Sequence, residues 1–223
     1  LSIKYNLKAI KPGFLQNMFP SNGFSIDSKI GYEWNSFMDG FGINEEYSTF
    51  GANFLPHNTF RFTFDSIFHF RLRPLKHWVS SISTQFGWLS NNKVDNFFHF
   101  FAGGYPGLKG YTFYNEELTG SRKVIVTSET RVPIFIEQNY VYGNINIQNM
   151  SLGMILQTGG GFNNSFLSFI DNEKYKFSTG LELRINGFSF YSYPTALEYE
   201  YHKGISDFNE MGRHYLSILF GFG

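Results

Sequence analysis

Long runs of alternating apolar and polar residues constrain the fold of this chain more than any other feature. In one strong run, residues 60–73, the apolar set is Phe60, Phe62, Phe64, Phe68, Phe70 and Leu72, and the polar set is Arg61, Thr63, Asp65, His69, Arg71 and Arg73. A period of two places successive side chains on opposite faces of an extended strand. In a soluble sheet six such large side chains would need a protein cover, whereas a face that meets lipid needs none. The run therefore predicts a β-strand with one apolar and one wet face.

Several other segments carry the same alternation. Residues 24–35 have Phe24, Ile26, Ile30, Tyr32 and Trp34 on one face and polar residues on the other. Further strands are expected over about residues 1–11, 78–89, 124–134, 149–161, 175–186, 193–202 and 214–222, and residues 140–148 could extend the strand that follows them. The expected total is about nine or ten strands, with no amphipathic helix and no repeat of fixed period.

Turn signals separate these runs. Pro12–Gly13, Phe19–Gly23 and Pro74–Lys76 are expected to form turns. Residues 38–46, rich in glycine and acidic residues, are expected to form a loop. Residues 47–55 are either a short strand or part of that loop, which residues 56–58 close.

Composition narrows the class of protein. Aromatic residues make up 20% of the chain, which contains 28 phenylalanines, and barrel proteins place such residues in girdles at both membrane interfaces. A mean hydropathy of -0.22 and the lack of an apolar run of about 18 residues exclude a helical membrane protein. The 18 basic residues balance the 18 acidic ones, so no nucleic-acid partner is expected. The absence of cysteine excludes disulfides and zinc–thiolate sites.

A segment of unusual composition lies near the middle of the sequence. Residues 97–111 contain six aromatic residues and four glycines around one lysine, Lys109. Glycine admits backbone conformations that other residues cannot adopt. The segment is therefore expected to be a strand that leads into a tightly folded loop, at about residues 102–121, turned back inside a transmembrane barrel.

No motif of catalysis or cofactor binding is present. The six histidines are scattered, without partners at metal-ligand spacing, and Gly159–Gly161 lacks the lysine and helix of a phosphate loop. No catalytic residue, metal or cofactor is therefore expected. One alternative stays open, a barrel hydrolase that assembles serine, histidine and an acid from separate strands.

Two charged residues, Glu129 and Arg131, share one face of a strand whose other face carries valines. If the valines meet lipid, both charges point into the lumen. They either form part of a wet lumen wall or help to hold Lys109, because a lysine in a confined lumen needs a carboxylate partner. Glu182 is a further candidate for that partner.

The order of several short motifs resembles the C-terminal barrel region of an outer-membrane superfamily, the BamA-type insertases and two-partner-secretion transporters (bacterial surface antigen type). The resemblance covers about residues 19–223. The motifs are Phe19–Gly23 before an alternating strand, Phe101–Gly104 followed by Leu108–Tyr111, Ser128–Pro133, Gly180–Arg184, Pro194–Tyr199 and a final aromatic strand.

The resemblance implies a 16-stranded barrel whose sixth extracellular loop folds into the lumen. In the superfamily the loop tip carries Arg-Gly-Phe or Arg-Gly-Tyr, and its arginine pairs with acidic residues of the inner wall. Lys109, Gly110 and Tyr111 occupy the matching positions here. Lysine keeps the charge but lacks the planar fork of arginine, so bidentate pairing is lost.

The resemblance also implies a function. The chain is expected to be a non-enzymatic, multi-pass protein of the bacterial outer membrane that assists insertion or translocation of polypeptides, with outer-membrane lipid, a polypeptide substrate and possible periplasmic or lipoprotein subunits as partners. About nine or ten strands are too few for the family barrel, and an open half-barrel leaves backbone groups unpaired in lipid. Residues 1–223 are thus expected to be the C-terminal part of one barrel domain. The alternative is a barrel anchor or structural subunit of a larger cell-envelope assembly, with the activity in a fused domain or partner.

Overall fold

The computed structural model describes residues 1–11, 20, 22–44, 49–72, 77–92, 94–171, 175–190, 193–206 and 211–220. The fold is all-β, and its main feature is a ten-stranded antiparallel sheet. Its strands are β1 (Ser2–Lys11), β2 (Asn22–Asn44), β3 (Thr49–Arg71), β4 (Val79–Leu89), β7 (Arg122–Phe135), β8 (Tyr140–Tyr142), β9 (Ile145–Phe162), β10 (Lys176–Ser189), β11 (Tyr193–Gly204) and β12 (Arg213–Phe220). The turns expected at Pro12–Gly13 and Pro74–Lys76, and Phe19, Ser21 and Arg73, lie outside the described residues.

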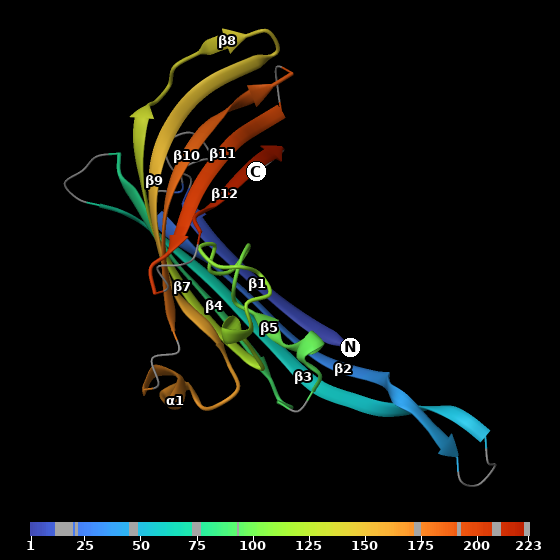
Figure 1. Ribbon diagram of the computed structural model, residues 1–223. Coiled ribbons are helices and arrows are strands. Elements are labelled where there is room, and N and C mark those ends of the chain that lie inside the picture. The colour runs from blue at the N-terminus through green and yellow to red at the C-terminus, as the bar shows by residue number, and fades with distance from the viewer. Residues whose placement is uncertain are drawn as a thin grey trace.

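Strand order in the sheet follows chain order. Neighbours run β1-β2-β3-β4-β7-β9-β10-β11-β12, and β8 forms a short hairpin with β9. The sheet is long, twisted and curved, as Figure 1 shows. Its described strands do not close into a barrel, and β1 and β12 form its two edges. The expectation of an all-β antiparallel sheet is therefore confirmed.

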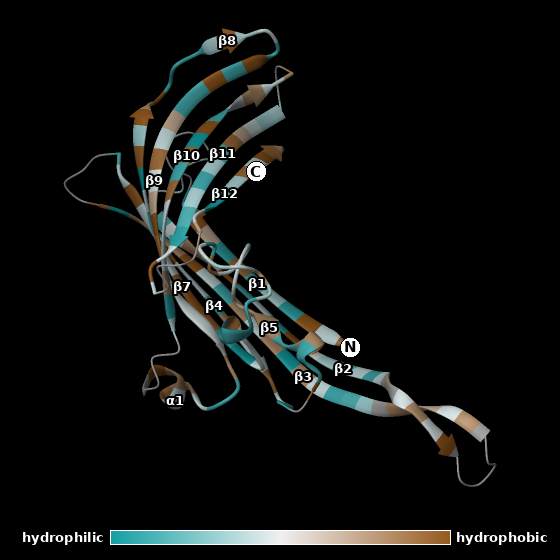
Figure 2. Ribbon diagram, viewed as in Figure 1, coloured by the Kyte–Doolittle hydropathy of each residue, from teal (hydrophilic) through white to brown (hydrophobic). Residues whose placement is uncertain are grey.

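The register sorts side chains onto two different faces. Leu181 pairs with Met154 and Tyr201, and these side chains belong to an apolar face that is open to the surroundings. The exposed fraction is 63% for Leu181, and large apolar residues of β3, β9 and β12 are similarly exposed. The next residue, Glu182, pairs with Glu200 and belongs to the opposite, polar face. Figure 2 shows the resulting alternation of hydrophilic and hydrophobic residues along the strands.

The hairpin of β2 and β3 projects beyond the rest of the sheet (Figure 1). Pairing with β1 reaches only Gly31, and pairing with β4 begins only at Arg61. Beyond these points β2 and β3 pair with each other alone, over residues 34–44 and 49–60, which we call the arm. The expected loop over residues 38–46 is thus wrong for residues 38–44. Pro56 lies within β3, where a free strand edge tolerates its missing N–H group.

The segment between β4 and β7 is compact but mostly irregular. It contains the short elements η1 (Asn96–Phe98), β5 (Phe100–Phe101), η2 (Glu116–Leu118) and β6 (Thr119–Gly120). Its residues Ala102, Leu108, Tyr111 and Leu118 form a buried cluster with Ile125 of β7.

One α-helix, α1 (Phe166–Asp171), connects β9 and β10, where the sequence suggested none. Among the described residues, no helix is both long and apolar enough to span a membrane.

Candidate functional site

The segment between β4 and β7 lies against the polar face of the sheet. Gln157 of β9 accepts a hydrogen bond from the Lys109 backbone N–H (3.0 Å) and donates from Nε2 to the Gly107 carbonyl (3.0 Å). The Gly110 N–H donates to Ser178 Oγ of β10 at 3.2 Å. Side chains of two strands therefore fix the backbone of the segment tip, which we call the seated tip (residues 106–111).

An ion pair joins the seated tip to β11. Lys109 Nζ lies 2.6 Å from Glu200 Oε1, and the two side chains are 16% and 4% exposed. On the next strand, Tyr215 donates from its hydroxyl to the Lys109 carbonyl at 2.8 Å. A charged pair with so little access to water is costly to break, because removing one partner leaves the other charge uncompensated.

Gly110 and Tyr111 complete the tip. A Cβ on Gly110 would lie 2.5 Å from the backbone nitrogen of Gly204, so only glycine allows this approach to β11. Tyr111 is 1% exposed, and its hydroxyl donates to the Phe177 carbonyl at 2.7 Å and accepts from the Ser206 N–H at 3.2 Å. The three tip residues singled out in the sequence are thus all in contact with the polar face.

The acidic partners expected for Lys109 pair with another cation. Glu182 contacts Arg131 through two bonds, from Nε at 2.9 Å and from a terminal nitrogen at 3.0 Å. Glu129 lies 2.6 Å from the same Nε. Among the described residues, the carboxylate that meets Lys109 is Glu200, and not Glu129 or Glu182, the two candidates taken from the sequence. Arg131 and its two glutamates form a separate ion-pair group.

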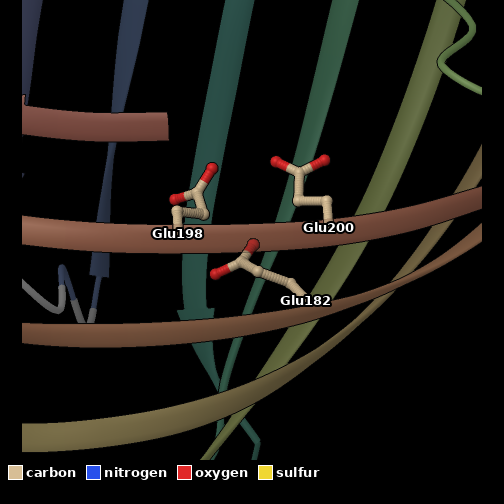
Figure 3. Close-up of side chains that lie close together, drawn as sticks. All are labelled: Glu182, Glu198 and Glu200. Atoms are coloured by element: carbon tan, nitrogen blue, oxygen red, sulfur yellow. The ribbon is translucent and has the colours of Figure 1, made fainter. Parts of the chain in front are cut away.

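Further contacts link the Lys109–Glu200 pair to the group of Arg131 and its two glutamates. Figure 3 shows the carboxyl groups of Glu182, Glu198 and Glu200 side by side on two neighbouring strands. One oxygen of each lies within 4.8 Å of the others. Arg184 pairs with Glu198 at 3.2 Å. The polar face thus carries a continuous charge network, from Arg131 on β7 to Lys109 in the seated tip.

The buried end of this network is His202. It is 0% exposed, and its Nε2 lies 2.5 Å from Glu200 Oε2, so Glu200 joins the histidine to Lys109. In all, four glutamates face two arginines, one lysine and one histidine. Because Lys109, Arg131 and Arg184 already neutralise the three clustered carboxylates, the arrangement fits a structural charge network better than a metal site.

Glu200, His202, Gln157, Ser178 and Tyr215 were not singled out from the sequence. A local signal does exist for two of them. Residues 198–202 read Glu-Tyr-Glu-Tyr-His, which places three ionisable side chains on one face of a strand and two tyrosines on the other. No comparable sequence pattern marks Gln157, Ser178 and Tyr215, because their role depends on which strands the segment tip contacts in the folded protein.

His99 is a buried titratable residue of the same segment. His99 is 7% exposed, and its Nε2 has no hydrogen-bond partner among the described residues. Burial lowers the pKa of His99 below its usual range, although Asn92 and Asp95 oppose this shift. The neutral imidazole is therefore the form that suits the seated segment.

No protein-family model and no curated protein matches the chain. The geometry of the segment and of the two sheet faces is consequently the basis for assigning a function.

Proposed function

We propose that this chain is part of an outer-membrane β-barrel that assists the insertion or translocation of polypeptides. The observation that carries the proposal is the seated tip. A Lys-Gly-Tyr tip lies on the polar face of an antiparallel sheet, and a buried Lys109–Glu200 pair holds it there. This arrangement resembles the inward-folded loop of the BamA-type superfamily, with lysine in place of arginine.

The two faces of the sheet support a membrane-spanning barrel. In this proposal the exposed apolar face meets lipid, and the polar face with its charge network lines the lumen. Strands β1 and β12 have no further partner among the described strands. Unpaired strand edges are costly in lipid, so further strands complete the barrel, which has 16 strands in the superfamily.

The proposed mechanism uses backbone pairing and no covalent chemistry. The outer edge of β12 forms one side of a seam with the first strand of the barrel. When the seam opens, this edge pairs with an incoming strand through main-chain hydrogen bonds. The seated tip contacts β9, β10, β11 and β12, so it braces the strands that lead up to the seam.

The test is insertion of an unfolded outer-membrane polypeptide by the full-length protein in lipid vesicles, followed as protease-protected product. Lys109→Ala leaves Glu200 without its lysine, at a cost of the order of 3 kcal/mol to the seated state. We expect slower insertion, changed pore conductance and faster proteolysis of residues 102–121. Lys109→Arg keeps the charge and should behave like the parent protein.

Lys4→Ala is the matched control, because the Lys4–Asp27 pair has side chains 65% and 37% exposed. It should change none of the three readouts. If Lys109→Ala also leaves them unchanged, the role of the seated tip is contradicted. A correctly folded parent protein that inserts no polypeptide would contradict the insertase function and favour a membrane anchor.

A further inference from the structure

The arm carries an apolar surface that the proposed insertase function does not use. Its large side chains are exposed by 54% to 75%, and they come from both strands. They are Trp34, Met38, Phe41, Ile43, Phe50 and Phe54. Phe41 and Phe50 stack with ring centroids 5.6 Å apart, which places the two strands' apolar side chains on one side of the arm.

A β-bulge in β2 keeps the apolar side chains of this strand on one side of the arm. Pairing of β2 with β3 shifts between Met38 and Gly40, so that Asp39 is the extra residue. Without the shift, Phe41 and Ile43 would change faces, because side chains alternate with a period of two. With it, Phe41 pairs with Ala52 and Ile43 with Phe50, on the same side as Met38 and Phe54.

The apolar side of the arm continues the apolar face of the sheet. Phe54 and Phe60 have the same alternation as Phe68, which is 48% exposed on that face. Asp39 is the one Asp, Glu, Lys or Arg in residues 34–44 and 49–60. On the opposite side Gly42 pairs with Gly51, and a Cβ on Gly51 would have no atom within 4 Å.

We propose that the apolar side of the arm rests on the surface of the same bilayer that the sheet crosses, at the boundary between headgroups and acyl chains. The inference rests on the proposed membrane-spanning barrel. An element that is apolar on one side and, in its described residues, carries almost no charge suits this boundary, where tryptophan and phenylalanine are favoured. The described residues of the arm offer a protein partner almost no charge, whereas specific interfaces have a polar rim.

Site-specific fluorescence tests the proposal, since this sequence contains no cysteine. In the full-length protein, with any cysteine elsewhere replaced by serine, a single Ile43→Cys is labelled with an environment-sensitive dye. Gly51→Cys, one position away on the other side of the arm, is the matched control. The proteins are reconstituted in phosphatidylethanolamine–phosphatidylglycerol vesicles. Quenching is then measured with brominated lipid and with aqueous iodide.

We expect the label at residue 43 to lie about 5–10 Å into the headgroup–acyl boundary, so that brominated lipid quenches it at least about twofold more than the label at 51. Iodide should show the reverse order. If iodide quenches both labels equally, the arm stands in water and the proposal is overturned. Protection of residue 43 from both quenchers indicates a protein contact, such as a second copy, and also overturns it.

A third label separates this inference from the function on which it rests. Leu152→Cys lies on the apolar face of β9, where Leu152 is 52% exposed. Brominated lipid should quench this label if the sheet spans the membrane. Quenching at 152 but not at 43 rejects the arm proposal alone, whereas no quenching at 152 rejects the membrane-spanning barrel itself.

Discussion

The fit of the seated tip depends on the absence of a side chain at residue 110. In Gly110→Ala the new methyl group would meet the Gly204 nitrogen at 2.5 Å and the Lys203 carbonyl carbon at 2.7 Å. Both are backbone atoms of β11, which cannot rotate away. We expect the tip to lift from the polar face, and limited proteolysis of the folded protein should then cut residues 102–121 faster.

Gly51→Ala is the control for this substitution, because its Cβ would meet no atom within 4 Å. It should be cut at the parental rate. Equal rates for Gly110→Ala and the parent protein would mean that the tip does not sit as closely against β11 as described.

The burial of His99 is expected to make the seating of the segment dependent on pH. Its pKa is lowered in the folded protein, so the unfolded chain binds the proton more readily. Stability therefore falls as the pH drops below the unfolded value, about 6.5 for histidine. We expect proteolysis of the segment to accelerate between about pH 7 and pH 5 in detergent-solubilised protein.

His99→Asn removes the titrating group and should weaken this pH dependence, while other histidines still titrate. An unchanged pH profile in His99→Asn would assign the effect to a different group.

At the residue scale, the sequence pointed to Lys109 as a residue in need of a carboxylate, but its candidates did not include Glu200. It required a carboxylate for Lys109 because a confined lysine must be compensated. The sequence alone does not say which glutamate of the polar face meets Lys109. That depends on which strand the tip contacts, and hence on how far the segment extends across the sheet. The tip passes β7 and pairs with β11, so Glu129 and Glu182 remain with Arg131.

At the scale of single elements, alternation located most strands to within a few residues, and the arm is the main exception. Gly40, Gly42, Pro56 and the nearby acidic residues all favour a loop when considered locally. Pairing across the hairpin overrides these preferences. The extra residue Asp39 shifts the alternation of β2 by one position, so a search for one continuous pattern does not detect this part of the strand. The short helix α1 was also missed, since six residues are too few for a helical period to be visible.

The last strand gives a test of the seam. A disulfide between Ser217→Cys on β12 and a cysteine in the first strand of the barrel should stop polypeptide insertion, because the seam can no longer open. Reduction of the disulfide should restore the rate. The measurement is the same protease-protection assay in vesicles.

A crosslink within the sheet controls for the seam disulfide. Leu197 and Ile218 are paired residues of β11 and β12, so Leu197→Cys with Ile218→Cys locks a pair that need not open. Full activity of the oxidised seam variant would reject the seam mechanism.

At the scale of the whole molecule, the two faces of the sheet should differ in how much stability an introduced charge costs. Ile82 is 41% exposed on the apolar face of β4, and Ser83 follows it on the polar face. In a lipid bilayer, Ile82→Arg is expected to lower the free energy of unfolding by about 2–4 kcal/mol. Ser83→Arg should cost much less, because its side chain lies on the polar face.

Urea titration of the protein in bilayers, followed by tryptophan fluorescence, measures both values. Similar losses for Ile82→Arg and Ser83→Arg would contradict the assignment of the apolar face to lipid.

The antiparallel sheet could be predicted from the sequence because alternating runs follow one another along the chain and turn signals separate several of them. Its curvature and the course of the segment between β4 and β7 could not, since they depend on contacts between residues far apart in the chain. Leu108 and Ile125, for instance, meet in one buried cluster only because the segment folds back over β7.

The contacts of the seated tip also set an order of events during folding. Lys109 bonds Glu200, which is 91 residues further along the chain, and accepts a bond from Tyr215, which is 106 residues further. Contacts over such separations form late, because a long loop must close first. The tip can therefore dock only after β11 and β12 have joined the sheet, and a docked tip marks a chain whose last strand is already in place.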